Sequence, residues 1–272
     1  MDKCSHGAMS FRFLCLITAA FATIDRFFVV VLENTDYATA MQDQYLGTTL
    51  PSQGRLLTNY KAVAHPSQPN YVAMIGGSTF GVSSDSNVNV KQKSIVDILT
   101  AGGKTWAAYE ENYPGNCFTG DSYPYKRKHN PFISYTTVAK DSTRCANIVP
   151  ASQLASDIQN KKVPSYVFYT PNMQNDGHDT DVGTASNWVE NTIGPLFTNP
   201  YFANTLFLIT FDEDESYTTN QVYALLMGGG VTPGSKDNTA YTHYSQLATV
   251  EMLFNLSNLG QNDAKATPFK IQ

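Results

Sequence analysis

The sequence predicts an α/β fold in which a mostly parallel sheet is sandwiched by helices. Short apolar runs rich in β-branched and aromatic residues alternate along the chain with segments of helical periodicity. The runs Arg26–Leu32 (RFFVVVL) and Thr205–Phe211 (TLFLITF) are apolar almost throughout. Such runs are typical of strands that helices cover on both faces, so we expect the sheet to lie inside the molecule.

Each element is predicted from its own local pattern. Several segments carry apolar residues at helical spacing; Gly102-Gly103 ends one of them, and Gly194-Pro195 is expected to break another. We expect strands at Arg26–Leu32, Leu56–Ala62, Thr105–Tyr109, Ser165–Thr170, Thr205–Phe211 and Val222–Met227, and helices at Ser94–Ala101, Ala151–Asn160, Ala185–Phe197 and Tyr244–Phe254.

The composition indicates one folded domain. The chain has 272 residues, of which 42% are hydrophobic, which is enough for a sizeable core and too much for a disordered chain. We expect a single domain over residues 23–272, with a loop-rich insertion at about residues 112–150.

Charged residues make up only 15% and the formal net charge is −5, which argues against a nucleic acid partner. The sequence does not define an oligomeric state.

The first residues have the pattern of a secretory signal. Phe13–Ala22 (FLCLITAAFA) is a short apolar stretch after the basic residues Lys3 and Arg12, and it ends in an A-x-A pattern. We therefore expect a signal peptide at residues 1–22 and a location outside the cell or in the cell wall. An ordinary buried first strand or helix is the alternative. No later segment is long and apolar enough for stable membrane insertion.

Cysteine usage agrees with this location. Cys117 and Cys145 remain after such a cleavage, as an even pair within the loop-rich segment. In an oxidising compartment they are expected to form a disulfide, which would stabilise the fold by roughly 3–4 kcal/mol. Two buried free thiols are the alternative.

Polar side chains follow three of the predicted strands, at the point where each strand ends. In open α/β sheets, ligands bind beyond the carboxyl ends of the strands. Carboxylates crowded there repel one another unless a cation lies among them, so we expect a divalent metal ion of undefined identity and number. A solvated loop is the alternative for each acidic cluster taken alone. The residues at these positions are Glu33, Asn34, Asp176, His178, Asp179, Asp212 and Glu213.

The segment His65–Tyr71 (HPSQPNY) supplies a candidate nucleophile, because Ser67 lies there between two prolines. A helix that begins near Asn70 would direct backbone amides at an anion. A serine hydroxyl is a poor nucleophile unless a metal or an adjacent base activates it. A plain proline turn is the alternative interpretation.

Histidines and one basic cluster complete the set of candidates. His178 lies in an Asp-Gly-His-Asp turn, and His243 precedes the last predicted helix. Lys128 and His129 belong to the basic cluster at Lys126–His129, which could contact a substrate phosphate. Structural histidines and a solvated basic loop are the alternatives.

Six segments, in this order along the chain, strengthen the functional interpretation. They are VLENTDY at Val31–Tyr37, HPSQPNY at His65–Tyr71, KHNPF at Lys128–Phe132, TPNMQNDGHD at Thr170–Asp179, FDEDE at Phe211–Glu215 and THYSQLATVE at Thr242–Glu251. Together they resemble the phosphoesterase family of the alkaline-phosphatase-like superfamily, which includes secreted fungal acid phosphatases and bacterial phospholipases C. The resemblance runs from about Asp25 to Phe269.

This resemblance implies an alkaline-phosphatase-like fold and the hydrolysis of phosphate esters by Ser67. His178, with Asp176 or Asp179 nearby, and His243 would bind phosphate or a second metal, or would protonate the leaving group. Asn70 would steady the transferred phosphoryl group. The implied ligands of a metal that also contacts Ser67 are Glu33, Asn34, Asp212 and Glu213.

Three hypotheses about function follow. The first is a secreted acid phosphatase that acts on small phosphate monoesters through a metal-assisted phosphoserine intermediate. The second is a phospholipase C or another phosphodiesterase that uses the same residues. The third is a non-catalytic secreted binding protein whose tyrosine-rich insertion contacts sugars or the cell wall.

Overall fold

A computed structural model of the protein describes residues 23–271, so the predicted signal peptide lies outside the described residues. An eight-stranded sheet in the order β5-β4-β6-β1-β7-β8-β2-β9 forms its centre. Neighbouring strands are parallel except at β8, which is antiparallel to β7 and to β2. The strands of this sheet are β1 (Arg26–Leu32), β2 (Arg55–Leu57), β4 (Trp106–Glu110), β5 (Ile148–Pro150), β6 (Tyr166–Thr170), β7 (Thr205–Phe211), β8 (Ala224–Gly228) and β9 (Ser235–Asp237).

Helices surround the sheet. The α-helices are α1 (Tyr37–Ala40), α2 (Leu50–Gln53), α3 (Ser67–Gly76), α4 (Ile95–Ala101), α5 (Pro131–Ser134), α6 (Thr136–Ala139), α7 (Ser142–Cys145), α8 (Gln153–Gln159), α9 (Val182–Trp188), α10 (Gly194–Phe197) and α11 (His243–Phe254). The π- and 3₁₀-helices are η1 (Tyr45–Thr49), η2 (Arg127–His129), η3 (Val189–Ile193), η4 (Pro200–Phe202) and η5 (Asn262–Lys265). Within residues 23–271, none of these helices has the length and apolar character to cross a membrane.

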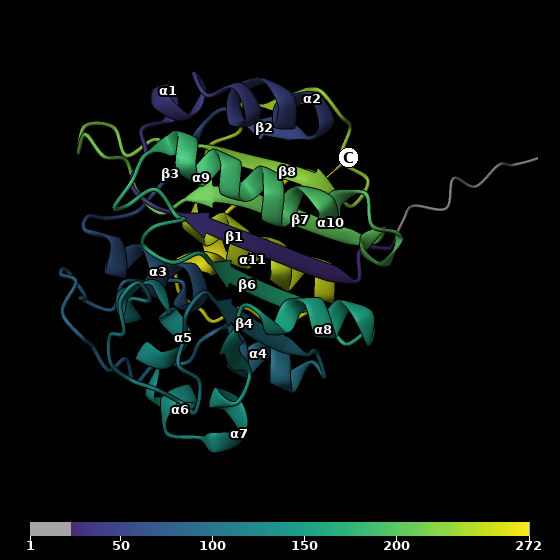
Figure 1. Cartoon of the computed structure of the whole chain (residues 1–272). Coiled ribbons are helices and arrows are strands. Elements are labelled where there is room, and N and C mark those ends of the chain that lie inside the picture. Colours follow the sequence, from purple (N-terminus) through teal and green to yellow (C-terminus); the bar gives the residue numbers. More distant parts are fainter. Residues whose placement is uncertain (1–22, 272) are drawn as a thin grey trace, which may run out of the picture.

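The two faces of the sheet are covered by different helices. In Figure 1, α8, α9 and α10 lie in front of the sheet and α11 lies behind it. α3 packs against α11 and α5. Every residue of β1 and β7 is buried, because both strands lie at the centre of the sheet between the two helical layers. This arrangement confirms the predicted fold class, a mostly parallel sheet sandwiched by helices.

The predicted strand Leu56–Ala62 is wrong as a single element. β2 ends at Leu57, and Tyr60–Lys61 forms β3, which pairs with β10 (Tyr241–Thr242) in a separate two-stranded sheet. The chain turns at residues 58–59 because the buried ring of Tyr60 packs against Phe269 and His243, away from the main sheet.

The expected break at Gly194-Pro195 is also wrong. α9, η3 and α10 follow one another without interruption from residue 182 to residue 197. Pro195 lies in the first turn of α10, where its missing N–H costs little. The π-helical turn η3 before it takes up the irregularity, so the helical path continues where a break was predicted.

The loop-rich segment at residues 112–150 is partly regular. It contains η2, the short helices α5–α7 and β5, which pairs with β4 at the edge of the main sheet. The sequence analysis did not expect this edge strand. Cys117 and Cys145 form a disulfide with a Cα–Cα distance of 5.5 Å, which confirms the predicted pairing.

The three strands that carry the predicted polar ends are neighbours. β6, β1 and β7 are adjacent at the centre of the sheet, and the arrowhead of β1 in Figure 1 points toward the side where α3 lies. Backbone hydrogen bonds continue past the strand ends: Glu33 N donates to Asp176 O at 2.9 Å, and Asp212 N donates to Leu32 O at 3.0 Å. The strand-end loops are therefore held side by side, as the sequence predicted.

Candidate active site

Ser67 lies at the centre of the candidate site. It is the first residue of α3, and only 1% of its surface is exposed. Its Oγ lies 3.1 Å from Glu33 Oε2 and 3.2 Å from Glu213 Oε1. Lys128 Nζ lies 3.5 Å from the same oxygen. The structure thus brings together the candidate nucleophile, two of the candidate carboxylates and one candidate cation from four separate segments.

Asp212 adds a third carboxyl group beside these two. Its Oδ1 accepts a hydrogen bond from Asn34 N at 3.2 Å, and its Oδ2 has no hydrogen-bond partner among the described residues. Burial and the charges of Glu33 and Glu213 raise the pKa of Asp212 well above its usual range. A buried carboxyl oxygen without a partner is costly, and a cation or an acidic proton would stabilise it.

The carboxyl groups differ in charge because their neighbours differ. Burial alone would raise the pKa of Glu33, but the adjacent His129 and Lys128 outweigh it and lower this pKa to about 2. Burial and the charge of Glu33 raise the pKa of Glu213 to about 8. Glu33 is therefore ionised near neutral pH, whereas the raised pKa values of Glu213 and Asp212 mark a place where a bound cation would compete with protons.

Asn34 completes an oxygen-rich cluster. Its carboxamide lies 3.1 Å from Glu33 Oε2 and 3.3 Å from Glu213 Oε1. With its NH₂ on this side, Asn34 donates to both carboxylates; with its oxygen on this side, it would share a cation with them. Carboxylate, amide and hydroxyl oxygens are hard donors of the kind that divalent cations bind. Within residues 23–271, no three His, Cys, Asp or Glu side chains form a ready-made metal site.

His129 and Asp176 lie behind Glu33. His129 is buried, with Nε2 3.2 Å from Glu33 Oε2 and Nδ1 3.5 Å from Asp176 Oδ2. Burial alone would lower the pKa of His129, but Glu33 and Asp176 outweigh it and raise this pKa to about 9. A charged His129 between two carboxyl groups holds Glu33 in its ionised form. The structure therefore places His129 as a partner of Glu33 and not at an open surface.

Lys128 and His178 lie at the open side of Ser67. Lys128 Nζ lies 3.1 Å from Asp85 Oδ2 and 3.2 Å from His178 Nε2, and His178 Nδ1 lies 2.9 Å from Asp179 Oδ1. Burial alone would lower the pKa of Lys128, but Glu33 and Asp85 outweigh it and raise this pKa. A cleft of about 300 Å³ opens here, and a small phosphate ester would fit within it. It is lined by Asp85, Asn87, Asp121, Lys126, Lys128, Met173 and His178.

Gly177 separates Asp176, which points inward, from His178, which lines the cleft. It has a φ of +104°, and a Cβ at this position would lie 3.2 Å from Glu33 O. Any other residue would strain this turn and press on the backbone of Glu33. The glycine thus lets one short loop supply both a buried carboxyl group and an accessible imidazole.

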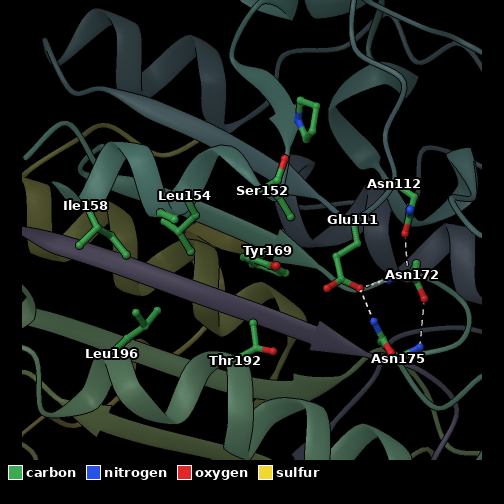
Figure 2. A pocket seen from close by; sticks show the side chains of 13 residues that line it. Glu111, Asn112, Ser152, Leu154, Ile158, Tyr169, Asn172, Asn175, Thr192 and Leu196 are labelled. Carbon is green, nitrogen blue, oxygen red and sulfur yellow. Dashed lines mark hydrogen bonds between the residues drawn. The ribbon is translucent and has the colours of Figure 1, made fainter. Parts of the chain in front are cut away.

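A second cavity lies at the base of the same loop but is not the site. It has a volume of about 630 Å³ and lies between α8 and the η3–α10 segment, as Figure 2 shows. At its polar end, Glu111 Oε2 accepts from Asn172 N at 3.0 Å and from Asn175 Nδ2 at 2.8 Å, and Glu111 Oε1 accepts from Trp188 Nε1 at 2.9 Å. Both carboxylate oxygens are therefore engaged, and Glu111 anchors the loop that carries Asp176.

The structure does not place Asn70 where a substrate could reach it. Asn70 is fully buried, and its Oδ1 accepts from Val63 N and Ala64 N, both at 3.0 Å. Its Nδ2 donates to Ala64 O at 2.8 Å. Because its amide is committed to the backbone before Ser67, the expected contact with the phosphoryl group is replaced by a role in holding this loop.

His243 is also set back from Ser67. Its Nδ1 lies 3.0 Å from Tyr60 Oη, and its Nε2 lies 2.6 Å from Asp212 O. Burial lowers its pKa to about 4, so the ring is neutral and donates to the carbonyl of Asp212. With both ring nitrogens engaged, His243 supports the strand-end residue Asp212, and the expected direct contact with phosphate does not fit this geometry.

Sequence reasoning missed three side chains that contact the predicted site. Tyr71 Oη donates to Glu33 Oε1, Asp85 pairs with Lys128, and His65 lies between Glu213 and Asp214. His65 and Tyr71 belong to the HPSQPNY segment, so their position beside Ser67 was a usable signal. Asp85 lies in a segment without a recognisable pattern, and nothing in the sequence indicated it.

Residues 40–257 match the Phosphoesterase family. The chain belongs to this family. Membership in the Phosphoesterase family confirms the resemblance seen in the six sequence segments.

Relatives of this phosphoesterase chain include fungal and bacterial proteins. A probable acid phosphatase of Kluyveromyces lactis is 43% identical over 265 residues, which cover 92% of this chain and 63% of the relative. An acid phosphatase of Aspergillus fumigatus is 41% identical over 262 residues, 91% of this chain and 58% of the relative. A phosphatidylinositol-3-phosphatase of Mycobacterium tuberculosis is 27% identical over 254 residues, 90% of this chain and 82% of the relative. The chain spans about three fifths of the length of these fungal relatives.

Solved structures share the fold of this phosphoesterase at low sequence identity. A protein in the alkaline phosphatase superfamily from Vibrio parahaemolyticus has a TM-score of 0.62 at 13% identity, covering 91% of this chain and 71% of that one. A phosphonate monoester hydrolase of Agrobacterium radiobacter has a TM-score of 0.56 at 8% identity, covering 86% of this chain and 74% of that one. These similarities confirm the predicted alkaline-phosphatase-like fold.

Proposed function

We propose that the protein is an acid phosphatase that hydrolyses small phosphate monoesters with Ser67 as nucleophile. The observation that carries this proposal is the position of Ser67 Oγ, at 3.1 Å and 3.2 Å from two carboxylates and 3.5 Å from Lys128 Nζ. Relatives named acid phosphatase, at 41–43% identity, support it. The cleft beside Ser67 suits a small substrate better than a membrane lipid.

The proposed reaction has two steps. Ser67 Oγ attacks the phosphorus, its proton passes to an adjacent carboxylate, and the bond to the leaving alcohol oxygen breaks. His178, which lines the cleft, supplies a proton to that oxygen. Water then attacks the phosphoserine and gives a proton to His178, and Ser67 takes its proton back from the carboxylate as phosphate is released. Lys128 offsets the negative charge on the phosphoryl oxygens, which is usually a large part of catalysis.

We propose that a divalent metal ion belongs to this site. The oxygens of Glu33, Asn34, Glu213 and Ser67 converge, and Asp212 adds a carboxyl oxygen that has no other partner among residues 23–271. When bound, such an ion would offset charge on the phosphoryl group and lower the pKa of the serine hydroxyl. Chelation should abolish activity and lower the melting temperature, and added Mg²⁺, Mn²⁺ or Ca²⁺ should restore both. Unchanged activity after complete metal removal would contradict this assignment.

The decisive test of function is phosphate release by purified protein. Wild-type protein should release 4-nitrophenol from 4-nitrophenyl phosphate, and Ser67→Ala should abolish the release. Ser134→Ala is a matched control, because Ser134 is equally buried and its hydroxyl has no hydrogen-bond partner among the described residues. A fully active Ser67→Ala variant would show that another residue is the nucleophile.

A pair of substrates separates the monoesterase from a phosphodiesterase. Lys128 and His178 both face the cleft, where their nitrogen atoms can contact the oxygens of a phosphate monoester. We expect 4-nitrophenyl phosphate to be cleaved faster than bis(4-nitrophenyl) phosphate. The reverse order would identify a phosphodiesterase, and the absence of hydrolysis of either ester would favour a binding protein.

We also propose secretion, with a mature domain that begins after residue 22. The apolar stretch Phe13–Ala22 supports a signal peptide, and the disulfide between Cys117 and Cys145 suits an oxidising compartment. Protein from the culture medium should have Thr23 as its first residue when its amino terminus is sequenced. Retention of full-length protein inside the cell would contradict this proposal.

A further inference from the structure

His65 forms a bridge between two consecutive acidic residues of the strand-end loop after β7. Its Nδ1 lies 2.5 Å from Glu213 Oε2, and its Nε2 lies 3.2 Å from Asp214 Oδ1. The other oxygen of Glu213, Oε1, lies 3.2 Å from Ser67 Oγ. One imidazole therefore connects a fixed acidic residue to the carboxylate that contacts the nucleophile.

Asp214 is a rigid end of this bridge. Its Oδ2 accepts hydrogen bonds from Thr219 N at 3.1 Å and Asn220 N at 2.7 Å, and its own N–H donates to Asn220 Oδ1 at 3.1 Å. The side chain is 1% exposed. These bonds close the turn at residues 214–220 and leave Oδ1 directed at His65.

Tyr217 covers the open face of His65. The two rings stack with their centroids 3.9 Å apart and an interplanar angle of 19°, although Tyr217 itself is 63% exposed. Tyr217 comes from the same turn that Asp214 closes. The imidazole is thus held by a hydrogen bond to Glu213, by the close approach of Asp214 Oδ1 to Nε2, and by one ring above it.

Glu213 needs such a restraint. Its Oε1 lies 3.2 Å from Ser67 Oγ, and a glutamate side chain has enough rotational freedom to turn away from Ser67. His65 has both ring nitrogens engaged with carboxyl groups, so neither is free to bind a substrate. Its contribution must therefore pass through Glu213.

We propose that His65 is a positioning residue that directs Glu213 at Ser67, and that Asp214 and Tyr217 hold His65 in place for this task. The proposal rests on the proposed function of Ser67 as nucleophile. Misplacement of a reacting group by about 1 Å costs on the order of 100-fold in rate. The loss of His65 should therefore lower kcat more than it changes KM.

The first test compares three substitutions of His65. Asn carries an N–H donor at the place of Nδ1, which contacts Glu213, and Gln carries one at the place of Nε2, which contacts Asp214. His65→Ala should lower kcat by about 10- to 100-fold with KM changed by less than about threefold. His65→Asn should retain more activity than His65→Gln, because it keeps the contact to Glu213. Equal activity of the two amide variants would overturn the proposal.

Imidazole provides a second readout that a purely structural residue would not give. The side chain of His65 is 20% exposed, so free imidazole can reach the space left in His65→Ala. Added imidazole should restore part of kcat in His65→Ala and should have no effect on wild-type protein or Ser67→Ala. A His65→Ala variant of reduced activity that imidazole does not restore would indicate general damage and contradict the proposal.

A crystal structure of His65→Ala separates this proposal from the proposed function. We expect Glu213 Oε1 to move out of hydrogen-bond distance of Ser67 Oγ, while Lys128 and Glu33 stay in place. If Glu213 keeps its contact with Ser67, the proposal is wrong whatever the activity. If Glu213 moves but wild-type protein releases no phosphate, the positioning role stands and the proposed function fails.

Discussion

At the scale of single residues, the balance of charge around Ser67 decides what the site can bind. Lys128 Nζ contacts Ser67 Oγ, Asp85 and His178 from the open side, while charged His129 lies behind Glu33. The open side of the site thus presents the Lys128 ammonium, which is paired with Asp85, where a phosphate would enter, and the back of the site holds a carboxylate paired with His129. An anion that arrives at the cleft meets the lysine before it meets Glu33.

Replacement of Lys128 by methionine tests this arrangement. Lys128→Met keeps the length of the side chain and removes its charge, so kcat/KM for a monoester should fall by about 100- to 1,000-fold. The melting temperature should change little, because the lysine lies at the rim of the cleft. Lys140→Met is the control: it lies in the same segment, is exposed, and should keep full activity. Equal losses in the two variants would show that Lys128 has no special role.

Asn70 provides a second residue-scale prediction, on stability. Asn70→Ala removes three partly buried hydrogen bonds to the loop before Ser67 and leaves the N–H groups of Val63 and Ala64 without this partner. We expect a loss of about 2–4 kcal/mol in the free energy of unfolding, measured in urea. Asn191→Ala is the control, since its amide makes one exposed hydrogen bond to Asn187 O and should cost less than about 0.5 kcal/mol. A change in Asn70→Ala as small as that of the control would refute the anchoring role.

Residue types after strand ends could be predicted, but the directions of side chains could not. Glu33 and Glu213 meet at Ser67 because β1 and β7 are adjacent, and the sequence indicates this through strand pattern alone. The polar atoms of Asn70 are bound by the backbone of the preceding loop, and those of His243 by Tyr60, which lies 183 positions away in the sequence, and by Asp212 O. Such partners become visible only when the chain is folded.

At the scale of elements, the segment at residues 112–150 carries two residues of the candidate site. It leaves the sheet after β4, supplies Lys128 and His129 through η2, and returns as β5 at the sheet edge. The sequence predicted loops here because short helices and a three-residue strand leave no lasting periodicity. The disulfide closes 28 positions of this segment and so encloses η2.

The disulfide should therefore matter for both stability and activity. On the chain-entropy account, a loop of this length contributes about 3–4 kcal/mol. The Cys117→Ser/Cys145→Ser double variant should lose about that much in urea unfolding, with weaker substrate binding because Lys128 is less well held. Wild-type protein unfolded in the presence of a reductant should match the variant. A double variant as stable as oxidised wild-type protein would contradict this prediction.

At the scale of the whole molecule, buried titratable groups set the pH at which the fold is most stable. Glu251 on α11 is 7% exposed, and burial together with Asp263 in η5 raises its pKa from 4.5 to about 8. His243 acts in the opposite direction, because burial lowers its pKa from 6.5 to about 4. The contribution of Glu251 to the free energy of unfolding is fully present below pH 4.5 and is lost as pH rises toward 8. The contribution of His243 to the same free energy is fully present above pH 6.5 and is lost as pH falls toward 4. The two together favour a stability maximum at mildly acid pH.

Glu251→Gln tests the loss of stability that we expect as pH rises above 4.5. The variant keeps the shape of the side chain and cannot ionise, so it should lose less stability than wild-type protein as pH rises. Between about pH 5 and about pH 8, we expect wild-type protein to lose about 3–4 kcal/mol more than the variant in urea unfolding. Because His243 is present in both proteins, its effect cancels in this difference. Glu190→Gln is the control, because Glu190 is exposed, and its stability should change with pH as that of wild-type protein does. If the stability of Glu251→Gln also changes with pH as in wild-type protein, the buried carboxyl group does not cause the loss of stability at alkaline pH.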